Sequence, residues 1–446
     1  MLLQFTVGNF LSFREPVTFS MMASPEIDGI PEDLRPVGDG KNVLSIGAIY
    51  GANASGKSNL LYAIAFARHL IFSINAPDQS LGVMSHSLDR KSIEGDSFFQ
   101  FIFKNGENIC KYGFKCNDSM IIEEWLYVDG SMYFLRNFID GIKKIELGDV
   151  FKENEEFYKF IVEGTRKEQL FIYELQNKNS DILRSTYQWF RNDLVVISDE
   201  GDNANSEPKF YAGKSLCLFI KMILKCADSG IQDINLKFTD NRIHLNTRHK
   251  SDLVKKLKES LSYTDMPIVA DVSNLGLKKI YGLRDDDLCE MEFEFRHSED
   301  MDIPFFYLHQ ESAGTQCLVD LLLSLMPSMS RIIIIDELDR RLHPNLSRLL
   351  IEVWRKMNRQ ESQLIFTTHD DNLLSDDLLR RDEVWLVDKD ETGHSSLTSL
   401  AEFKIPEGTN IERQYLRGRF GGVPYLRREE LDAFLEEIQN EGANLK

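Results

Sequence analysis

A glycine-rich octapeptide follows directly on a long apolar run near the start of this chain. Residues 43–50 (VLSIGAIY) are almost all apolar, as expected of a parallel strand that is buried on both faces. The octapeptide, residues 51–58, reads GANASGKS. Apolar residues then recur at helical spacing at Leu60, Ile64, Ala67 and Ile71. Strand, glycine-rich loop and helix in this order predict a parallel α/β sheet whose first loop surrounds phosphate groups.

The residue types of the octapeptide fit a nucleoside triphosphate. Gly51 and Gly56 allow backbone angles that turn successive N–H groups toward phosphate oxygens, and the helix start adds partial positive charge. Lys57 is expected to reach the outer phosphates, and the Ser58 hydroxyl is expected to ligate Mg²⁺. A chance match in an ordinary turn is disfavoured by the complete pattern. We therefore predict that ATP and Mg²⁺ bind here, at Gly51, Asn53, Ala54, Ser55, Gly56, Lys57, Ser58 and Asn59.

The second half of this site is expected far downstream, where residues 332–337 read IIIIDE. In open α/β sheets ligands bind beyond the carboxyl ends of the strands, which is where Asp336 and Glu337 emerge. Asp336 is expected to hold Mg²⁺, directly or through water. Glu337 is expected to polarise the water that attacks the γ-phosphate. The alternative, a strand that ends in solvated acids, is disfavoured by the presence of the phosphate loop.

Three further elements accompany the acidic pair. Residues 311–316 (ESAGTQ) precede an apolar helical stretch, and a serine at a helix start makes an anion seat, although by itself it indicates only a helix cap. Asp339 closely follows the acidic pair. His369 ends the apolar strand 364–368, where it would lie beside a γ-phosphate, whereas a lone histidine is more often structural.

The order of these motifs resembles the ATPase heads of the ABC type, in the branch of SMC, RecF and OLD proteins. In such heads two protomers enclose two ATP molecules between them. The resemblance implies that Ser312, Ala313, Gly314 and Thr315 form a signature that acts in trans, that Asp339 couples the two sites, and that His369 senses the γ-phosphate in catalysis beside Glu337. The signature departs from L-S-G-G-Q, because Glu311, Ala313 and Thr315 replace leucine, the first glycine and glutamine. Gln100 is the candidate for the glutamine lid.

Over nearly its whole length the sequence is similar to a group of bacterial AAA ATPases with ABC-like heads. The similarity is carried by residues 9–14 (NFLSFR), 311–316, 336–344 and 414–424 (QYLRGRFGGVP). Members of this group, RloA-like and PARIS AriA-like, occur in anti-phage and abortive-infection systems. The resemblance implies a regulatory ATPase that engages head to head on ATP, forms a homodimer or higher homo-oligomer, and controls a separate effector protein, a nuclease or toxin. A phage protein is a further candidate partner.

The predicted fold is α/β, a P-loop ABC-type ATPase head assembled from both chain ends with an inserted β-lobe and helical domain. Residues 1–149 are the N-terminal half of the head with the phosphate loop and the β-lobe, whose hairpins turn at Asn105-Gly106 and Asp129-Gly130. Residues 150–287 are a mainly helical insertion. Residues 288–446 are the C-terminal half with the signature, the Asp-Glu strand and the His loop, and with strands at 331–336, 363–368 and 383–387.

The charge balance bears on the alternative function, a RecF-like DNA-binding or repair ATPase. The 52 Lys and Arg residues against 71 Asp and Glu residues give a net charge of −19, which argues against a surface coated for nucleic acid but leaves a local basic groove open. Six cysteines without metal-binding spacing, and the lack of a signal-like or membrane-spanning stretch, indicate a cytoplasmic protein.

Two remaining features, the acidic runs and the C-terminal tail, each have two interpretations. Acidic runs at residues 285–287 (DDD) and 388–390 (DKD) are either solvated turns or metal ligands of an OLD-type nuclease, and the former is favoured. The Arg/Gly-rich tail at residues 417–422 either docks on the sheet or meets another subunit.

Overall fold

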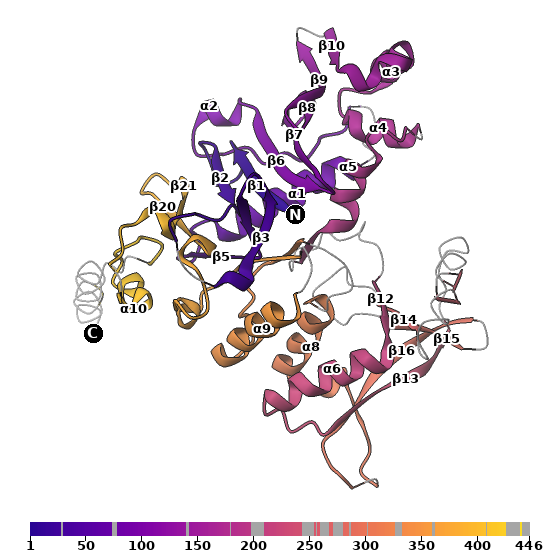
Figure 1. Ribbon diagram of the computed structural model, residues 1–446, viewed down its shortest axis with the longest axis vertical. Coiled ribbons are helices and arrows are strands. Elements are labelled where there is room, and N and C mark those ends of the chain that lie inside the picture. The colour runs from indigo at the N-terminus through magenta and orange to yellow at the C-terminus, as the bar shows by residue number, and fades with distance from the viewer. Residues whose placement is uncertain are drawn as a thin grey trace.

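A six-stranded sheet in the computed structural model joins the two ends of the chain (Figure 1). The structure describes residues 1–27, 30–73, 78–139, 142–178, 180–197, 209–242, 254–255, 257–258, 267–270, 280–284, 287–300, 302–325, 332–358, 362–406, 408–424 and 438. In spatial order the strands are β11 (Leu194–Ile197), β18 (Ile332–Ile335), β19 (Gln363–Thr367), β5 (Ile46–Gly51), β20 (Val384–Lys389) and β21 (Ser395–Ser399).

The first five strands in this spatial order, β11, β18, β19, β5 and β20, are all parallel, and only β21 is antiparallel to its neighbour. Strand β5, from the N-terminal part, pairs with β19 on one side and β20 on the other, both from the C-terminal part. The predictions of an α/β head built from both chain ends and of strands near 331–336, 363–368 and 383–387 are therefore confirmed.

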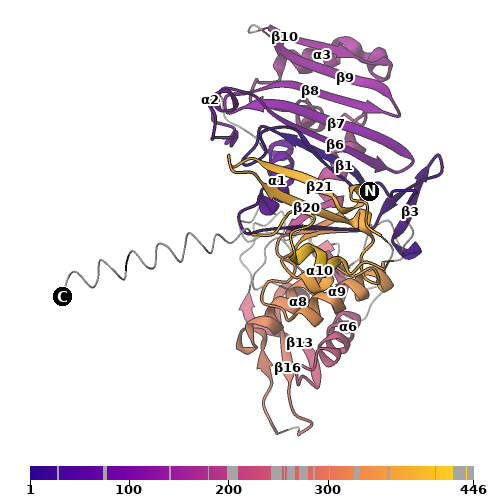
Figure 2. The same cartoon turned by 90° about the vertical axis from the view of Figure 1, so that its left-hand side faces the viewer.

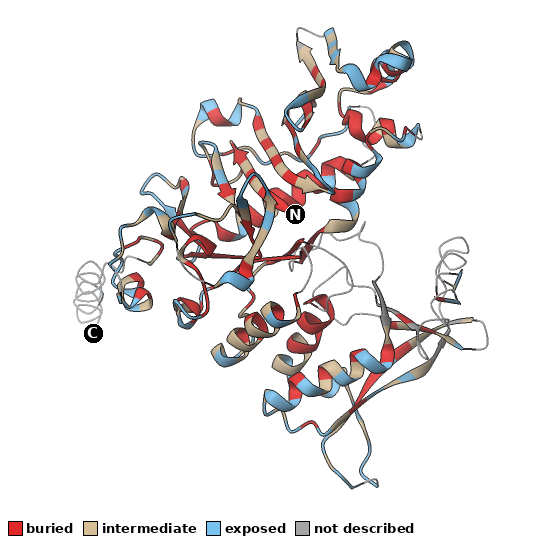
Figure 3. Cartoon of the chain, viewed as in Figure 1, coloured by how far each residue is buried: buried red, intermediate tan, exposed pale blue. Residues whose placement is uncertain are grey.

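The central sheet is buried on both faces and separates two apolar cores (Figure 3). In β18 the side chains of Ile332 and Ile334 belong to one core, and those of Ile333 and Ile335 belong to the other. This alternation explains the unbroken isoleucine run, because neighbouring side chains point to opposite faces and each meets an apolar layer.

An antiparallel sheet and helix α1 (Lys57–Phe72) supply the first core. Its strands lie in the order β10 (Ile142–Leu147), β9 (Ser131–Ile139), β8 (Met120–Val128), β7 (Asn108–Asn117), β6 (Ser97–Asn105), β1 (Leu2–Gly8) and β2 (Val17–Ser20). Figure 2 shows these strands on one side of the central sheet. Both predicted hairpin turns fall between strands of this β-lobe. Helices α3 (Glu155–Gly164), α4 (Phe171–Asn177) and α5 (Arg184–Gln188) pack beside it.

The second core lies between the central sheet and helices α6 (Gly213–Cys226), α8 (Ala313–Leu325) and α9 (Pro344–Met357). A further antiparallel sheet adjoins these helices. Its strands are β12 (Lys209–Ala212), β14 (Pro267–Ala270), β15 (Ile280–Arg284), β16 (Asp287–Arg296) and β13 (Asp233–Arg242), and β17 (Phe306–Tyr307) pairs with β16.

The segment expected to be a mainly helical insertion, 150–287, differs from that expectation. Its described part holds α3 to α6, but it also holds strands β12 to β15 and contributes β11 to the central sheet. The reason is visible in β13, where Ile234, Leu236 and Phe238 alternate with polar residues at the period of a strand. They pair with β16, whose Phe293 and Phe295 are buried.

Shorter elements connect these layers: β3 (Leu34–Gly38), β4 (Lys41–Leu44), α2 (Arg90–Ile93), α10 (Ile411–Leu416) and several single turns. The six cysteines all lie in the described residues and are not joined by disulfides. Across the described residues, every helix is too short or too polar to span a membrane.

A buried carboxylate joins the β-lobe to the helices that pack on it. Glu124 of β8 is fully buried and accepts hydrogen bonds from the backbone N–H groups of Phe171 and Ile172, the first residues of α4, at 2.7 and 3.1 Å. The Tyr112 hydroxyl donates to it at 3.1 Å, and the Arg136 guanidinium lies 3.5 Å away. Burial raises the pKa of Glu124, and Arg136 together with these donors opposes the rise.

We expect Glu124→Ala to lower the free energy of unfolding by about 3–5 kcal/mol, because it leaves Arg136 as a buried charge without its partner. Urea unfolding followed by tryptophan fluorescence measures the loss. The control is Glu123→Ala, whose carboxylate is bonded to Lys115 at the partly exposed face and should cost no more than about 1 kcal/mol. Equal losses of unfolding free energy in the two variants would show that the buried pair does not stabilise the packing of α4 on the β-lobe.

Candidate nucleotide site

The loop between β5 and α1 has a conformation that only its glycines allow. Gly56 has φ of +114°, and a Cβ at this position would lie 2.5 Å from Ser395 Oγ and 2.6 Å from Ser12 Oγ. A Cβ at Gly51 would lie 2.4 Å from the Val387 carbonyl oxygen. The glycines are therefore needed for a close approach of the loop to β20, β21 and the segment around Ser12.

Lys57 begins α1 and folds back over the loop. Its side chain is 5% exposed, and its ammonium donates to the carbonyl oxygens of Gly51 at 2.8 Å and Ala52 at 3.2 Å. Burial lowers the pKa of Lys57 to about 8, although Asp336, Glu337 and Asp339 act to raise it. A triphosphate bound at this loop would favour the charged lysine, because it brings negative charge to a poorly solvated ammonium.

The acidic pair meets this loop at the carboxyl edge of the sheet. Asp336 Oδ1 accepts hydrogen bonds from Ser58 Oγ at 3.2 Å and from Thr367 Oγ1 at 2.5 Å. Thr367 Oγ1 in turn accepts from the backbone N–H of Glu337 at 2.7 Å. One hydroxyl at the end of β19 thus holds both acidic residues at the end of β18, beside the first turn of α1.

Glu337 itself has an unusual backbone. Its φ is +54°, a left-handed conformation that costs energy for a residue with a Cβ and that occurs often at functional sites. The carboxylate is 45% exposed and lies 4.0 Å from Arg340 Nε. It is thus free of the tight pairing that holds Asp336.

A cavity of 460 Å³ opens beside this cluster. Ser58, Asn59, Asp336, Glu337 and Arg340 form its polar part, and the remaining lining is Leu11, Leu61, Tyr62, Ala65, Met84 and Val196. The Ser58 hydroxyl and the Asp336 carboxylate are hard oxygen donors at one end of this space, the ligand type that Mg²⁺ prefers. The residues present therefore fit the predicted Mg²⁺.

His369 and Asp339 lie next to each other at the same edge. The backbone N–H of His369 donates to the Asp339 carboxylate at 3.2 Å, and the imidazole is exposed. Partial burial of the ring and the nearby Lys57 ammonium lower the pKa of His369, against the opposing effect of Asp339 and the acidic pair. A neutral imidazole is the form that this shift favours at neutral pH.

The predicted signature lies at the exposed start of α8. Ser312 is exposed, its Oγ accepts from the Thr315 N–H at 3.1 Å, and it shares a hydrogen bond of 2.9 Å with Thr315 Oγ1. Ala313 is also exposed. A Cβ at Gly314 would lie 3.2 Å from the Arg341 carbonyl oxygen, so this helix start packs closely on the loop that carries Asp339.

The other predicted site residues lie in different surroundings. Asn53 and Ala54 are exposed in the loop, Ser55 is buried with its carbonyl oxygen bonded to Ser395 Oγ, and Asn59 donates to Ser12 Oγ at 2.8 Å. Gln100 lies within β6, between Thr6 and Gly113, and the described lining of the 460 Å³ cavity contains no glutamine.

Sequence reasoning did not single out Thr367, Ser12 or Ser395 as parts of the site. Thr367 had one available signal, its place at the end of the strand before His369. Ser12 and Ser395 approach the loop from distant parts of the chain. The backbone N–H of Ser395 donates to the Ser12 carbonyl oxygen at 2.8 Å, so the two serines hold each other as well as the loop.

The Arg/Gly-rich tail docks on the sheet, the first of its two interpretations. The Tyr415 hydroxyl donates to the Gly422 carbonyl oxygen at 2.9 Å, and the Tyr415 ring meets that of Tyr50 at 5.8 Å. A Cβ at Gly422 would lie 3.5 Å from the Cα of Gly51, so the tail contacts the start of the phosphate loop. Of the two acidic runs, Asp390 caps its own turn by accepting from the N–H groups of Thr392 and His394, whereas Asp285 and Asp286 lie outside the described residues.

Comparison with known proteins gives one family and a set of solved structures. A family model described as "AAA domain, putative AbiEii toxin, Type IV TA system" matches residues 46–132 and 218–375, more than half of the chain. No curated protein sequence matches.

The similar solved structures include three SMC heads, each with 14% identity. A head bound to the C-winged helix domain of ScpA has a TM-score of 0.41, over 89% of this chain and 97% of that one. The head domain from Thermotoga maritima has a TM-score of 0.34 over 91% and 99%. A head with an extended coiled coil bound to the C-terminal domain of ScpA, from Pyrococcus furiosus, has 0.36 over 98% and 99%.

The clash at Gly56 gives a prediction about the loop. A residue with a Cβ in this left-handed conformation costs about 1–3 kcal/mol in backbone strain alone. Gly56→Ala should lower the free energy of unfolding by more than this, because its Cβ also displaces Ser12 and Ser395. The control is Gly82→Ala, at a φ of +70° with no heavy atom within 4 Å of the added Cβ. Urea unfolding compares the two variants. A Gly82→Ala loss as large as that of Gly56→Ala would show that packing around Gly56 does not constrain the loop.

Proposed function

Because the chain belongs to the family of AAA domains described as putative AbiEii toxins of type IV toxin–antitoxin systems, we propose that it is a Mg²⁺-dependent ATPase that controls a separate effector in anti-phage defence. The family supports the ATPase, and its toxin–antitoxin description supports a role in defence. ATP binding closes two copies of the head on each other, and hydrolysis releases them.

One observation carries the proposal. Ser58 of the phosphate-loop half and Asp336, Glu337 and Thr367 of the other half form one hydrogen-bonded cluster beside Lys57. A cluster of this composition supplies what phosphoryl transfer requires: a lysine and N–H groups for the phosphates, oxygen ligands for a divalent cation, and a carboxylate for the water.

Each residue of the cluster has a role that follows from its surroundings. Ser58 and Asp336 would hold Mg²⁺, which supplies charge neutralisation at the phosphates when it is bound. Lys57 binds the outer phosphates. Glu337, half-exposed and loosely paired, orients the attacking water and accepts its proton. His369, kept neutral by its surroundings, hydrogen-bonds the γ-phosphate.

The exposed signature supports assembly through ATP. Ser312 and Ala313 lie on the surface at a helix start, where N–H groups attract an anion. We assign them to the γ-phosphate held by a second copy, so that each site is complete only between two protomers. The same surface, remodelled by ATP, would hold or release the effector. The net charge of −19 gives the alternative of a DNA-repair ATPase no support.

The catalytic assignment is tested by two variants with opposite expected behaviour. Glu337→Gln should lower the rate of ATP hydrolysis by about 100-fold or more while it retains ATP, because it removes the base and leaves the phosphate contacts intact. Lys57→Ala should lose ATP itself. Hydrolysis, ATP retention and mass in solution are measured with and without ATP and Mg²⁺.

Glu337→Gln should also accumulate as the assembled form with ATP. Glu391→Gln, an exposed acid in the turn between β20 and β21, is the control and should hydrolyse ATP as the wild type does. Wild-type hydrolysis by Glu337→Gln would contradict the role of this glutamate, and a chain that stays monomeric while it hydrolyses ATP would contradict the shared site.

Mixing variants tests whether the signature acts in trans. Lys57→Ala and Ser312→Glu should each be inactive alone, because each breaks both sites of a homodimer. In a mixed dimer one site combines an intact phosphate loop with an intact signature, so a one-to-one mixture should regain about a quarter of the wild-type hydrolysis. The matched control mixes Lys57→Ala with Glu337→Gln, whose defects lie in the same half-site, and should regain none. Failure of the first mixture to hydrolyse ATP, although the mixed dimer is shown to form when ATP is present, would rule out a signature in trans.

A further inference from the structure

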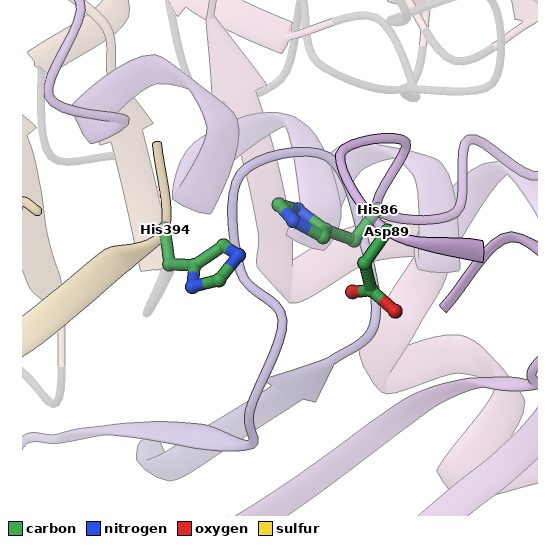
Figure 4. A group of neighbouring side chains, drawn as sticks. All are labelled: His86, Asp89 and His394. Atoms are coloured by element: carbon green, nitrogen blue, oxygen red, sulfur yellow. The ribbon is translucent and has the colours of Figure 1, made fainter. Parts of the chain in front are cut away.

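A second cluster of chemically active side chains lies beside the segments of Ser12 and Ser395, which contact the phosphate loop. His86, Asp89 and His394 each place one potential ligand atom within 4.8 Å of the others' (Figure 4). His86 and Asp89 belong to the segment before and at the start of α2, and His394 precedes β21. A cavity of 800 Å³, lined in part by His86 and Ser12, opens beside this cluster.

His86 is the strongest sign that the cluster has a ligand. Its side chain is fully buried, and its Nδ1 is hydrogen-bonded to the Leu11 carbonyl oxygen at 2.8 Å. A carbonyl oxygen can only accept, so Nδ1 carries the proton, and in the neutral ring Nε2 presents a lone pair. That buried Nε2 has no hydrogen-bond partner. A buried acceptor without a partner is costly, and a metal ion at Nε2 would satisfy it.

The other two side chains are held in position by their neighbours. His394 Nδ1 lies 3.0 Å from Thr392 Oγ1 and 3.5 Å from Asp390 Oδ2. Asp89 caps α2 by accepting from the Ser92 N–H at 3.0 Å, and Arg14 Nε lies 3.3 Å from its Oδ2. Asp89 Oδ2 also accepts from Ser92 Oγ at 2.6 Å, so Oδ1, which accepts from the Ser92 N–H, is the oxygen that keeps a lone pair for a ligand. Metal-binding histidines typically have their other nitrogen fixed by a carbonyl or carboxylate in this way.

From this geometry we propose that His86, Asp89 and His394 bind one divalent transition-metal ion, Zn²⁺ or an ion of the same class. Two imidazoles and one carboxylate suit such an ion far better than Mg²⁺ or Ca²⁺, which prefer oxygen. Ligand atoms around tetrahedral Zn²⁺ are about 3.4 Å apart, so the ion would draw the three together slightly. His394 is only partly buried and is the side chain that would make this adjustment, and water would complete the coordination.

The ion would fix the positions of two segments that contact the phosphate loop. His394 is followed by Ser395, whose hydroxyl donates to the Ser55 carbonyl oxygen within the loop. His86 is bonded to Leu11, and the next residue, Ser12, accepts from the Ser395 N–H. A metal that links His86 to His394 therefore ties together the two segments that hold the loop.

The test measures Zn²⁺ binding to the full chain, free of nucleotide and stripped of metal, by calorimetry and by competition with a chromogenic chelator. The wild type should bind one Zn²⁺ per chain. His394→Ala and Asp89→Asn should each bind it at least about 10-fold more weakly. Asp89→Asn keeps a residue that caps helices well, so it separates metal binding from folding. His309→Ala, at an exposed histidine outside the cluster, is the control and should bind as the wild type does.

Two further measurements test the coordination geometry of the metal site and its independence from the proposed ATPase site. Co²⁺ should give the visible absorption of a tetrahedral site in the wild type and lose it in His394→Ala. Lys57→Ala should keep full Zn²⁺ affinity, which separates this site from the proposed ATPase. The proposal is wrong if the wild type fails to bind Zn²⁺, if His394→Ala and Asp89→Asn both bind as tightly as the wild type, or if Lys57→Ala abolishes binding.

Discussion

The pairing of β5 with β19 and β20 is the constraint on which the site depends. Its register places Thr367 opposite Ile49 and Val387 opposite Gly51, so the parallel strands end at one edge of the sheet. The phosphate loop, Thr367 and the acidic pair meet only because of this alignment. A slip of one residue would turn every side chain of β5 to the other face and would separate Lys57 from Asp336. Burial of the sheet between two apolar cores makes such a slip costly.

The sequence predicts much of this site because its signals are local. A strand, a glycine-rich loop and a helix are adjacent in the chain, and an isoleucine run that ends in Asp336 and Glu337 is unmistakable. Thr367 and Ser395 escape prediction because their contacts join strands or loops that are distant in sequence and depend on register. The strands within 209–284 escape prediction for a different reason: an alternating pattern is present in β13, but the helical pattern of α6 beside it outweighs this signal.

The phosphate loop is held on several sides by segments from distant parts of the chain. Ser12 and Ser395 approach Gly56 closely, and Val387 and the tail at Gly422 approach Gly51. These segments come from different parts of the chain, and the contacts of Ser12 and Ser395 with Gly56 and of Val387 with Gly51 leave no room for a Cβ. A loop constrained in this way is preorganised for an anion, which lowers the cost of ordering it when a ligand binds. The same contacts explain why the C-terminal tail, Tyr415 and Gly422 included, belongs to the head.

One short loop connects the proposed chemistry to the surface that a second copy would meet. Arg340 lies beside the Glu337 carboxylate, and its carbonyl oxygen accepts a hydrogen bond from Cys317 Sγ of α8 at 3.3 Å. The carbonyl oxygen of Arg341 packs on Gly314 at the start of the same helix. These contacts connect Glu337 to the exposed helix start that we propose as the signature through three or four residues. Gly314 leaves little space there, so the start of α8 and this loop are packed together, and this packing is the contact through which the proposed catalytic glutamate and the proposed signature would be coupled.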